Sequence, residues 1–262
     1  MRSLCETPPP HIAVPLAGAA LIGLALFAAS GLAMAAETRD TAFVSERNAL
    51  ATEVAHDLDR IRPGSTKSEL RKQVLGAIRS VPRHEFVPES LRIEAYQNRP
   101  LPIGHGQTIS QPTVVALMTE LLAPRAGQRI LEIGTGSGYQ AAILAALGAE
   151  VFTIEIIPAL GERASKHLAR LGYHNVRARV GDGYHGWAEH APYDAIIVTA
   201  ATNHIPPKLI EQLKPNGHMA ILVGNPFGQQ QLILATKDES GRVTTQKVLA
   251  VRFVPLTGDA QK

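Results

Sequence analysis

The sequence predicts an α/β protein with a doubly wound, mostly parallel Rossmann-like sheet, an antiparallel C-terminal edge and an N-terminal helical extension. Short apolar segments alternate with segments of helical periodicity from residue 113 onward, which implies right-handed crossovers between parallel strands. A glycine-rich turn follows the first of these apolar segments. The last two apolar segments have no helix between them, and we expect them to form the antiparallel edge.

Composition excludes several classes of protein. The chain has 262 residues, 45% of them hydrophobic, with one cysteine and 26 Lys and Arg against 23 Asp and Glu. Its length suits one sizeable domain. One cysteine excludes a disulfide scaffold, and the hydrophobic content excludes a disordered chain. The net charge of +3 comes without a basic run, so we expect no nucleic-acid partner.

The first 36 residues have the pattern of an export signal. Arg2 precedes a stretch from Thr7 to Ala36 without Asp, Glu, Lys or Arg, and Ala-Met-Ala at 33–35 forms a small-x-small cleavage site. We expect cleavage after Ala35 or Ala36 and export, to the periplasm. The alternative is an uncleaved anchor, which would be the protein's membrane contact. The single cysteine, Cys5, lies within this segment.

Residues 37–98 are predicted to form a helical extension. Apolar positions recur with helical spacing from residue 41 to Ile61 and from Leu70 to Ile78. The sequence Pro-Gly-Ser at 63–65 separates the two helices, and Ser65 or Thr66 is suited to cap the second. Residues 83–88 are predicted to be an extended link, and residues 89–95 a short helix.

The remaining chain, residues 99–262, is predicted to be the main domain. It begins with a loop rich in Gly and Pro, residues 99–112. The elements expected after this loop are, in order, helix 113–122, strand 129–133, helix 139–147, strand 151–156, helix 160–171, strand 176–180, strand 194–199, helix 207–213, and strands 218–223, 231–236 and 244–252.

The segment Arg129 to Tyr139, R-I-L-E-I-G-T-G-S-G-Y, runs from a buried strand through glycines into a helix, and a ligand is expected at such a turn. Tyr139 stands where the dinucleotide pattern needs its third glycine, and no phosphate-loop lysine follows. Glu132 before the turn would repel a pyrophosphate but suits a ligand with a cationic amine, such as S-adenosylmethionine. The alternative is a turn that only joins strand to helix.

Two further acids follow successive predicted strands. Glu155 ends the second strand, about twenty residues on, where an acid can accept hydrogen bonds from both ribose hydroxyls; the alternative is an ordinary acid at a strand end. Asp182 in V-G-D-G-Y follows the third strand. It is either a turn aspartate or an acceptor for an adenine amine, with Gly183 letting the backbone reach the ring.

Other chemistries have little support. The ten histidines form no H-E-x-x-H or H-x-H pattern, so we expect no metal site. Ser137 lacks the G-x-S-x-G context of a hydrolase nucleophile. His105, between two glycines, is interpreted as a solvated loop residue or a substrate contact, and Trp187 as a packing residue.

Five segments, residues 100–112, 131–142, 181–187, 191–201 and 251–256, closely resemble protein-L-isoaspartate O-methyltransferases, a family of class I methyltransferases that use S-adenosylmethionine. The resemblance extends from about Ser68 to Thr257. The T-I-S-Q-P loop and the V-P-L ending are specific to this family. Two features of this chain depart from the family. Asn98 stands where an acid is expected, and the chain has the pattern of an export signal although the family is generally cytosolic.

The resemblance implies transfer of a methyl group from S-adenosylmethionine to the carboxylate of an isoaspartyl residue in a damaged protein. The ester then closes to a succinimide, whose hydrolysis returns some normal aspartate. Ser110 would orient the carboxylate; on sequence alone it also resembles a helix cap. The residues implied to bind the cofactor are Gln107, Thr108, Ile109, Ser110, Glu132, Gly134, Thr135, Gly136, Ser137, Gly138, Glu155, Asp182, Gly183 and Thr257.

Two alternatives stay open at this point. The same cofactor motifs would serve a methyltransferase acting on another carboxylate, such as that of a small-molecule acid. An exported binding protein without catalysis is the more distant possibility, because S-adenosylmethionine is made in the cytosol. The expected partners are damaged proteins and peptides that contain isoaspartyl residues, and the chain is expected to be a monomer.

Overall fold

The computed structural model describes residues 43–63, 69–225 and 228–259. The proposed export signal and the Ser65 or Thr66 cap lie outside the described residues. From residue 45 onward the described residues belong to one compact unit. Helix α3 (Glu69–Ser80) and nearly all of helix α2 (Val44–Ile61) therefore belong to the same unit as the sheet.

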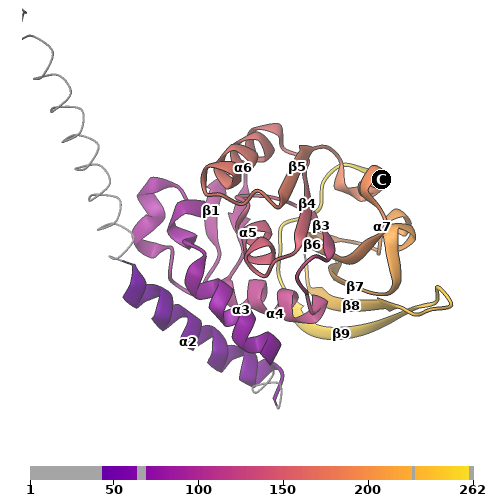
Figure 1. Ribbon diagram of the computed structural model, residues 1–262, viewed down its shortest axis with the longest axis horizontal. Coiled ribbons are helices and arrows are strands. Elements are labelled where there is room, and N and C mark those ends of the chain that lie inside the picture. Colours follow the sequence, from indigo (N-terminus) through magenta and orange to yellow (C-terminus); the bar gives the residue numbers. More distant parts are fainter. Residues whose placement is uncertain (1–42, 64–68, 226–227, 260–262) are drawn as a thin grey trace, which may run out of the picture. The chain divides into compact units, whose positions relative to one another are not determined.

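A seven-stranded sheet with the order β5-β4-β3-β6-β7-β8-β9 forms the centre of this unit (Figure 1). The first five strands in this order are parallel, and β8 and β9 pair antiparallel at one edge. Its strands are β3 (Arg129–Ile133), β4 (Glu150–Glu155), β5 (Val176–Val180), β6 (Tyr193–Thr202), β7 (Leu213–Gly224), β8 (Gln230–Lys237) and β9 (Val243–Val251). The predicted doubly wound fold with an antiparallel edge is confirmed.

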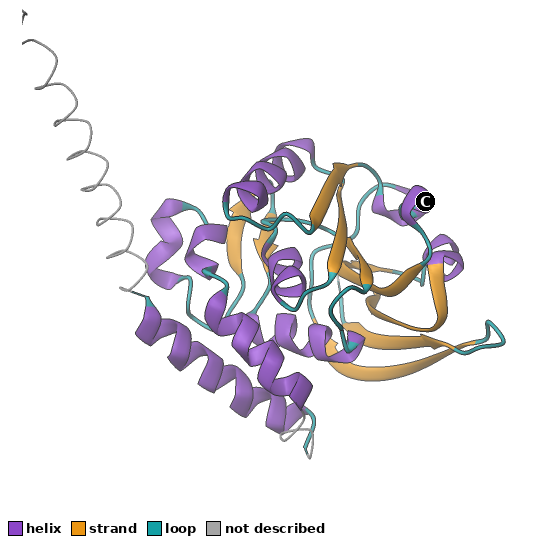
Figure 2. Ribbon diagram, in the orientation of Figure 1, coloured by secondary structure: helices purple, strands orange, loops and turns teal. Residues whose placement is uncertain are grey.

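Helices cover both faces of the sheet (Figure 2). One face packs against the longer helices α4 (Pro112–Leu122), α5 (Tyr139–Ala146) and α6 (Pro158–Arg170). The other face is covered by α7 (Pro207–Gln212) and two short 3-10 helices, η3 (Gly183–His185) and η4 (Ala188–His190). None of the described helices is both long and apolar enough to cross a membrane.

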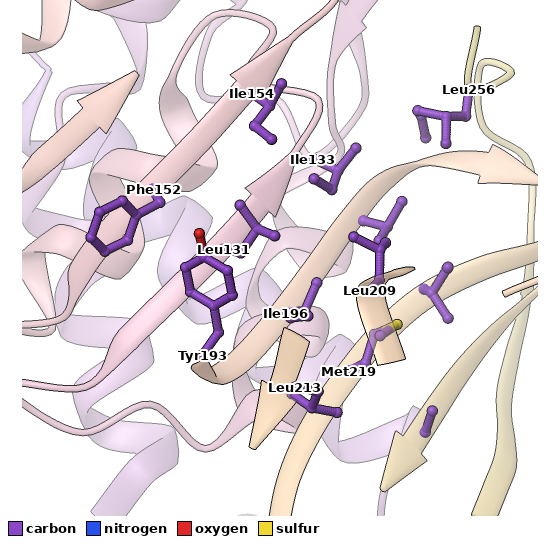
Figure 3. Close-up of a cluster of buried hydrophobic side chains, with 14 residues drawn as sticks. Leu131, Ile133, Phe152, Ile154, Tyr193, Ile196, Leu209, Leu213, Met219 and Leu256 are labelled. Atoms are coloured by element: carbon purple, nitrogen blue, oxygen red, sulfur yellow. The ribbon is translucent and has the colours of Figure 1, made fainter. Parts of the chain in front are cut away.

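Apolar side chains on the α7 side of the sheet form a cluster whose residues come mainly from β3, β4, β6, β7 and β8, and most of them are labelled in Figure 3. Phe152 and Tyr193 lie beside each other, with ring centroids 5.7 Å apart, and Leu256 lies at the opposite end of the cluster. Trp187 is partly buried and packs against this cluster. Its interpretation as a packing residue is confirmed. The cluster fixes the strands whose carboxyl ends carry the site.

The structure differs from the sequence prediction before α4. The predicted loop at 99–112 contains a hairpin of β1 (Leu101–Gly104) and β2 (Gln107–Ile109). The turn places His105 at φ 55, flanked by two glycines at positive φ, with the His105 side chain exposed. Two further 3-10 helices, η1 (Arg83–Phe86) and η2 (Glu89–Glu94), occupy the predicted link and short helix. Prolines and glycines break the period of both helices and strands, so the sequence pattern predicts neither the hairpin nor η1, whereas it does predict a short helix where η2 lies.

Candidate active site

A cleft opens where the chain order of the sheet reverses, between β3 and β6. In open α/β sheets this switch point is where ligands bind. The cleft encloses about 770 Å³ of empty space when the open solvent at its mouth is included. The predicted site residues that line it are Gln107, Thr108, Ile109, Ser110, Glu132, Gly134, Thr135, Gly136, Ser137, Glu155, Gly183 and Thr257.

Close packing fixes the backbone of the glycine turn. Gly134 has φ 95, and a Cβ atom there would lie 2.6 Å from Oγ1 of Thr199 on β6. That hydroxyl donates toward the carbonyl oxygens of Ile133 and Gly134, at 3.0 and 2.8 Å. A Cβ atom on Gly183 would lie 2.3 Å from Cγ2 of Ile133. A Cβ atom at 134 or 183 would force these neighbouring atoms to shift, so glycine lets both turns stay close to the floor of the cleft.

Glu132 lies on the floor of the cleft, and only one of its two carboxyl oxygens has a hydrogen-bond partner among the described residues. Its residue is 0% exposed, and Thr153 Oγ1 donates to its Oε2 at 2.6 Å. Its Oε1 is buried and has no hydrogen-bond partner among the described residues. Burial raises the pKa of Glu132 to about 8, the hydrogen bond from Thr153 opposes this change, and the nearby Glu155 adds to it. The group is therefore ready to accept a hydrogen bond from a cationic donor.

Glu155 ends β4 and binds the backbone of two turns. Its Oε2 accepts from the N–H of Gly136 at 2.8 Å, and its Oε1 accepts from the N–H of Ile157 at 3.0 Å. Each carboxylate oxygen has a second lone pair, which leaves one acceptor site on each for ribose hydroxyls. Glu155 therefore shapes the glycine turn as well as lining the cleft.

Two predicted residues are not among those that line the cleft. Gly138, at φ 90, is the N-cap of α5 and lies close against Leu168. Asp182 is the N-cap of η3: its Oδ1 accepts from the N–H of Tyr184 at 2.9 Å, and its Oδ2 accepts from the N–H of Asp259 at 2.8 Å. The structure thus gives Asp182 the turn role, and its contact with adenine remains a prediction.

The predicted loop that precedes α4 also lines the cleft, through residues 107–110. Ser110 is half-buried, and its hydroxyl makes no hydrogen bond to any described residue. It does not cap α4, because the N-cap is Gln111 and makes no side-chain cap bond. Ser110 and Thr108 also line a second cavity, beside the first, with Val114 and the segment Leu249–Pro255. Ser110 is thus exposed to both spaces.

Several residues of the site are absent from the sequence prediction. Thr199 interrupts an apolar strand near its carboxyl end, and this position was a signal that could have identified it. Tyr139 was noted for its place in the glycine pattern but also lines the cleft. Residues 254–256 line the cleft because the chain returns after β9 and pairs with β6 at Ala201. This return depends on tertiary packing and has no local sequence signal.

The lining residues fit S-adenosylmethionine. The unpartnered Oε1 of Glu132 suits the cationic amine of the methionine part, and Glu155 has free acceptor sites for the ribose. Gly183 presents its backbone to the cleft at a place that a Cβ atom could not share with Ile133. No lysine or arginine lines the cleft, so among the described residues nothing there would neutralise a pyrophosphate.

Known proteins are similar to this chain across most of its length. Residues 63–261 match the family described as protein-L-isoaspartate(D-aspartate) O-methyltransferase. A relative in Syntrophobacter fumaroxidans, named protein-L-isoaspartate O-methyltransferase 2, is 54% identical over 241 residues, which cover 92% of this chain and 97% of that protein. A relative of the same name in Polaromonas sp. is 59% identical over 197 residues, 75% of this chain and 93% of its own.

Solved structures show the same fold. One described as a protein-L-isoaspartate O-methyltransferase matches with a TM-score of 0.69 and 28% identity, covering 80% of this chain and 67% of its own. Another, from Plasmodium falciparum and in complex with S-adenosyl-L-homocysteine, matches with a TM-score of 0.63 and 24% identity, covering 78% of this chain and 97% of its own.

Proposed function

The chain belongs to the protein-L-isoaspartate(D-aspartate) O-methyltransferase family, and from this premise we propose how its cleft performs the family's reaction. It is a methyltransferase that uses S-adenosylmethionine to methylate the free carboxylate of L-isoaspartyl residues in damaged proteins. One observation carries the assignment of the site: the Gln107–Ser110 loop, the glycine turn and the 254–257 segment, far apart in the sequence, line a single cleft.

Four parts of the cleft hold the cofactor. Glu132 binds the amine of the methionine part, the glycine turn lies along the middle of the molecule, and Glu155 accepts from the ribose hydroxyls. Gly183 lies at the adenine end, with Asp182 beside it. When bound, S-adenosylmethionine supplies a methyl group on a sulfonium, which needs no acid or base for its transfer to an anion.

Ser110 positions the acceptor. Its hydroxyl lies between the cofactor cleft and the second cavity, so it can donate a hydrogen bond to a carboxylate that enters from that cavity. The carboxylate is already ionised at neutral pH, and no proton needs to move. Holding its oxygen in line with the methyl–sulfur bond at about 3 Å removes orientational freedom, which supplies several kcal/mol of the barrier.

A methylation assay tests this function. Purified mature chain is incubated with radiolabelled S-adenosylmethionine and a peptide containing isoaspartate, beside the same peptide with normal aspartate. Label should enter the isoaspartyl peptide and not its normal counterpart. Cofactor binding without labelling of either peptide would favour another carboxylate as the acceptor, and failure to bind the cofactor would favour a non-catalytic binding protein.

We also propose that the protein is exported and works in the periplasm as a monomer. Export is supported by the uncharged stretch from Thr7 to Ala36 and its Ala-Met-Ala site. Mass spectrometry of the native protein should give an N-terminus at Ala36 or Glu37, in the periplasmic fraction. An intact N-terminus in the membrane fraction would indicate an anchor instead, and light scattering checks the monomer.

A further inference from the structure

Asn98 closes the base of the β1–β2 hairpin. It lies just before β1, and Thr113 lies in the first turn of α4, just after β2. The Oδ1 of Asn98 accepts from the N–H of Thr113 at 3.1 Å. Asn98 thus satisfies a free N–H at the start of α4 that Ser110 or Gln111 would ordinarily cap, and the Ser110 hydroxyl is left available.

Helix α2 fixes this cap from the other side. The Oδ2 of Asp57 lies 2.8 Å from both the Nδ2 of Asn98 and the Oγ1 of Thr113, which donate to it. Glu53, one turn earlier on α2, accepts a longer bond from the same Nδ2 at 3.3 Å. Thr113 is 3% exposed and the Asp57 side chain is 17% exposed, so solvent replaces these bonds poorly.

The chemistry of the neighbours selects the residue type at 98. An ionised Asp57 only accepts hydrogen bonds, and the N–H of Thr113 only donates. The side chain between them must donate on one side and accept on the other, as the amide of Asn98 does. An aspartate could still accept from Thr113, but its carboxylate would face those of Asp57 and Glu53. An asparagine at 98 therefore fits the presence of α2.

We propose that Asn98 is a positioning residue for methyl transfer, and that helix α2, through Asp57, fixes the hairpin that carries Ser110. The hairpin strands pair Leu101 with Ile109 and Pro102 with Thr108. A shift at the Asn98–Thr113 base therefore moves the loop that faces the methyl donor. The proposal rests on the proposed methyl transfer to a carboxylate held by Ser110. A wild-type chain without activity would refute that function, whereas this proposal is judged by differences between variants.

The decisive experiment compares Asn98→Asp with the double variant Asp57→Asn, Asn98→Asp. In the single variant carboxylates face each other, and we expect kcat with an isoaspartyl peptide to fall by about 10- to 100-fold, the effect of misplacing a reacting group. The KM for S-adenosylmethionine should stay within about threefold, because the glycine turn is untouched. The double variant reverses donor and acceptor, and its kcat should return to within about threefold of wild type.

The pH profile separates positioning from a merely structural role. The kcat of Asn98→Asp should rise as pH falls, because a proton shared by Asp57 and the new carboxylate removes their repulsion. Glu53 and the cation of Arg60, which pairs with Asp57, are present in every variant. Wild type and the double variant should lack this rise. Asn48→Asp, the same change at an exposed site of α2, is the matched control and should keep wild-type kcat.

Several results would overturn the proposal. A wild-type kcat in Asn98→Asp, measured at a urea concentration well below its unfolding midpoint, would do so. A double variant that is folded but as slow as the single variant would do so too. Should Asn98→Asp not fold, Asn98→Ala takes its place, since it removes both bonds without adding charge. Its kcat should fall while the KM for the cofactor holds, and an unchanged kcat would refute the positioning role.

Discussion

At the scale of single residues, the site depends on polar atoms whose hydrogen-bonding capacity is only partly used within the fold. Glu132 Oε1 and the Ser110 hydroxyl lack partners among the described residues, and both lie where a ligand atom is needed. Glu155 differs, because both of its oxygens already accept from the backbone. Substitutions at these three positions should therefore have distinguishable effects.

Ser110→Ala should lower kcat more than cofactor affinity. The hydroxyl serves the acceptor carboxylate, and a hydrogen bond to a charged group contributes about 1.5–3 kcal/mol, which corresponds to about a 10- to 100-fold loss of kcat. Steady-state kinetics with an isoaspartyl peptide and calorimetry with S-adenosylmethionine measure the two quantities. A larger loss of cofactor affinity than of kcat would assign Ser110 to the cofactor instead.

Glu155→Ala should reduce both cofactor affinity and stability. Loss of the ribose hydrogen bonds should weaken binding by about 1–3 kcal/mol, and the N–H groups of Gly136 and Ile157 lose their acceptor at a similar cost in the free energy of unfolding. Calorimetry and urea unfolding measure these. Glu155→Gln, which keeps one acceptor oxygen, should lose less stability. An unchanged affinity in Glu155→Ala would show that the ribose assignment is wrong.

At the scale of elements, ion pairs of a buried arginine connect helices α2, α3 and α4. The guanidinium of Arg71 on α3 pairs with Glu120 on α4 through two bonds, and its Nη1 donates to Asp59 on α2 at 2.7 Å. Arg71 and Glu120 are almost fully buried. The extension is therefore connected to the main domain by a charge network as well as by apolar contacts.

Breaking this network should destabilise the protein. Arg71→Ala leaves the buried Glu120 carboxylate without its cation, which typically costs about 3–5 kcal/mol. Urea unfolding should show a lower midpoint for Arg71→Ala than for Arg79→Ala, which changes an exposed arginine at the end of the same helix. Equal midpoints for the two variants would show that the buried pair adds nothing.

The elements also show how far the sequence predicts this fold. Strands β3, β4 and β6 follow from their apolar runs, and the glycine turn with Glu132 and Glu155 locates the cleft. Strands β1 and β2 were missed because Pro100, Pro102 and two glycines interrupt their period. The roles of Asn98 and Thr199 come from contacts with Asp57 and Gly134, more than forty positions away, which no local pattern encodes.

At the scale of the whole molecule, the buried carboxyl group of Glu132 makes stability depend on pH. Its pKa is about 8 in the folded chain, against 4.5 when unperturbed. Below pH 4.5 both the folded and the unfolded chain hold the proton, and its stabilising contribution is complete. As pH rises toward 8 the unfolded chain releases the proton first, and stability falls.

The free energy of unfolding without cofactor should decrease from pH 5 to pH 8 by up to about 1.4 kcal/mol per pH unit from this group. Glu132→Gln should lack this part of the decrease, and the difference between the two proteins isolates it from other groups. Cofactor affinity should rise over the same range in wild type, because a cationic amine needs the ionised carboxylate. Parallel pH profiles for the two proteins would contradict the assignment.

Residues 254–257 form one wall of the cleft, and the ribosome synthesises them after every strand of the sheet. These residues follow every strand of the sheet and reach the cleft by pairing with β6. A ribosome-bound chain can fold its earlier units first, but it lacks this wall until the strands have already emerged. A ribosome-bound chain in which residues 254–257 have not yet emerged therefore lacks part of its cofactor site.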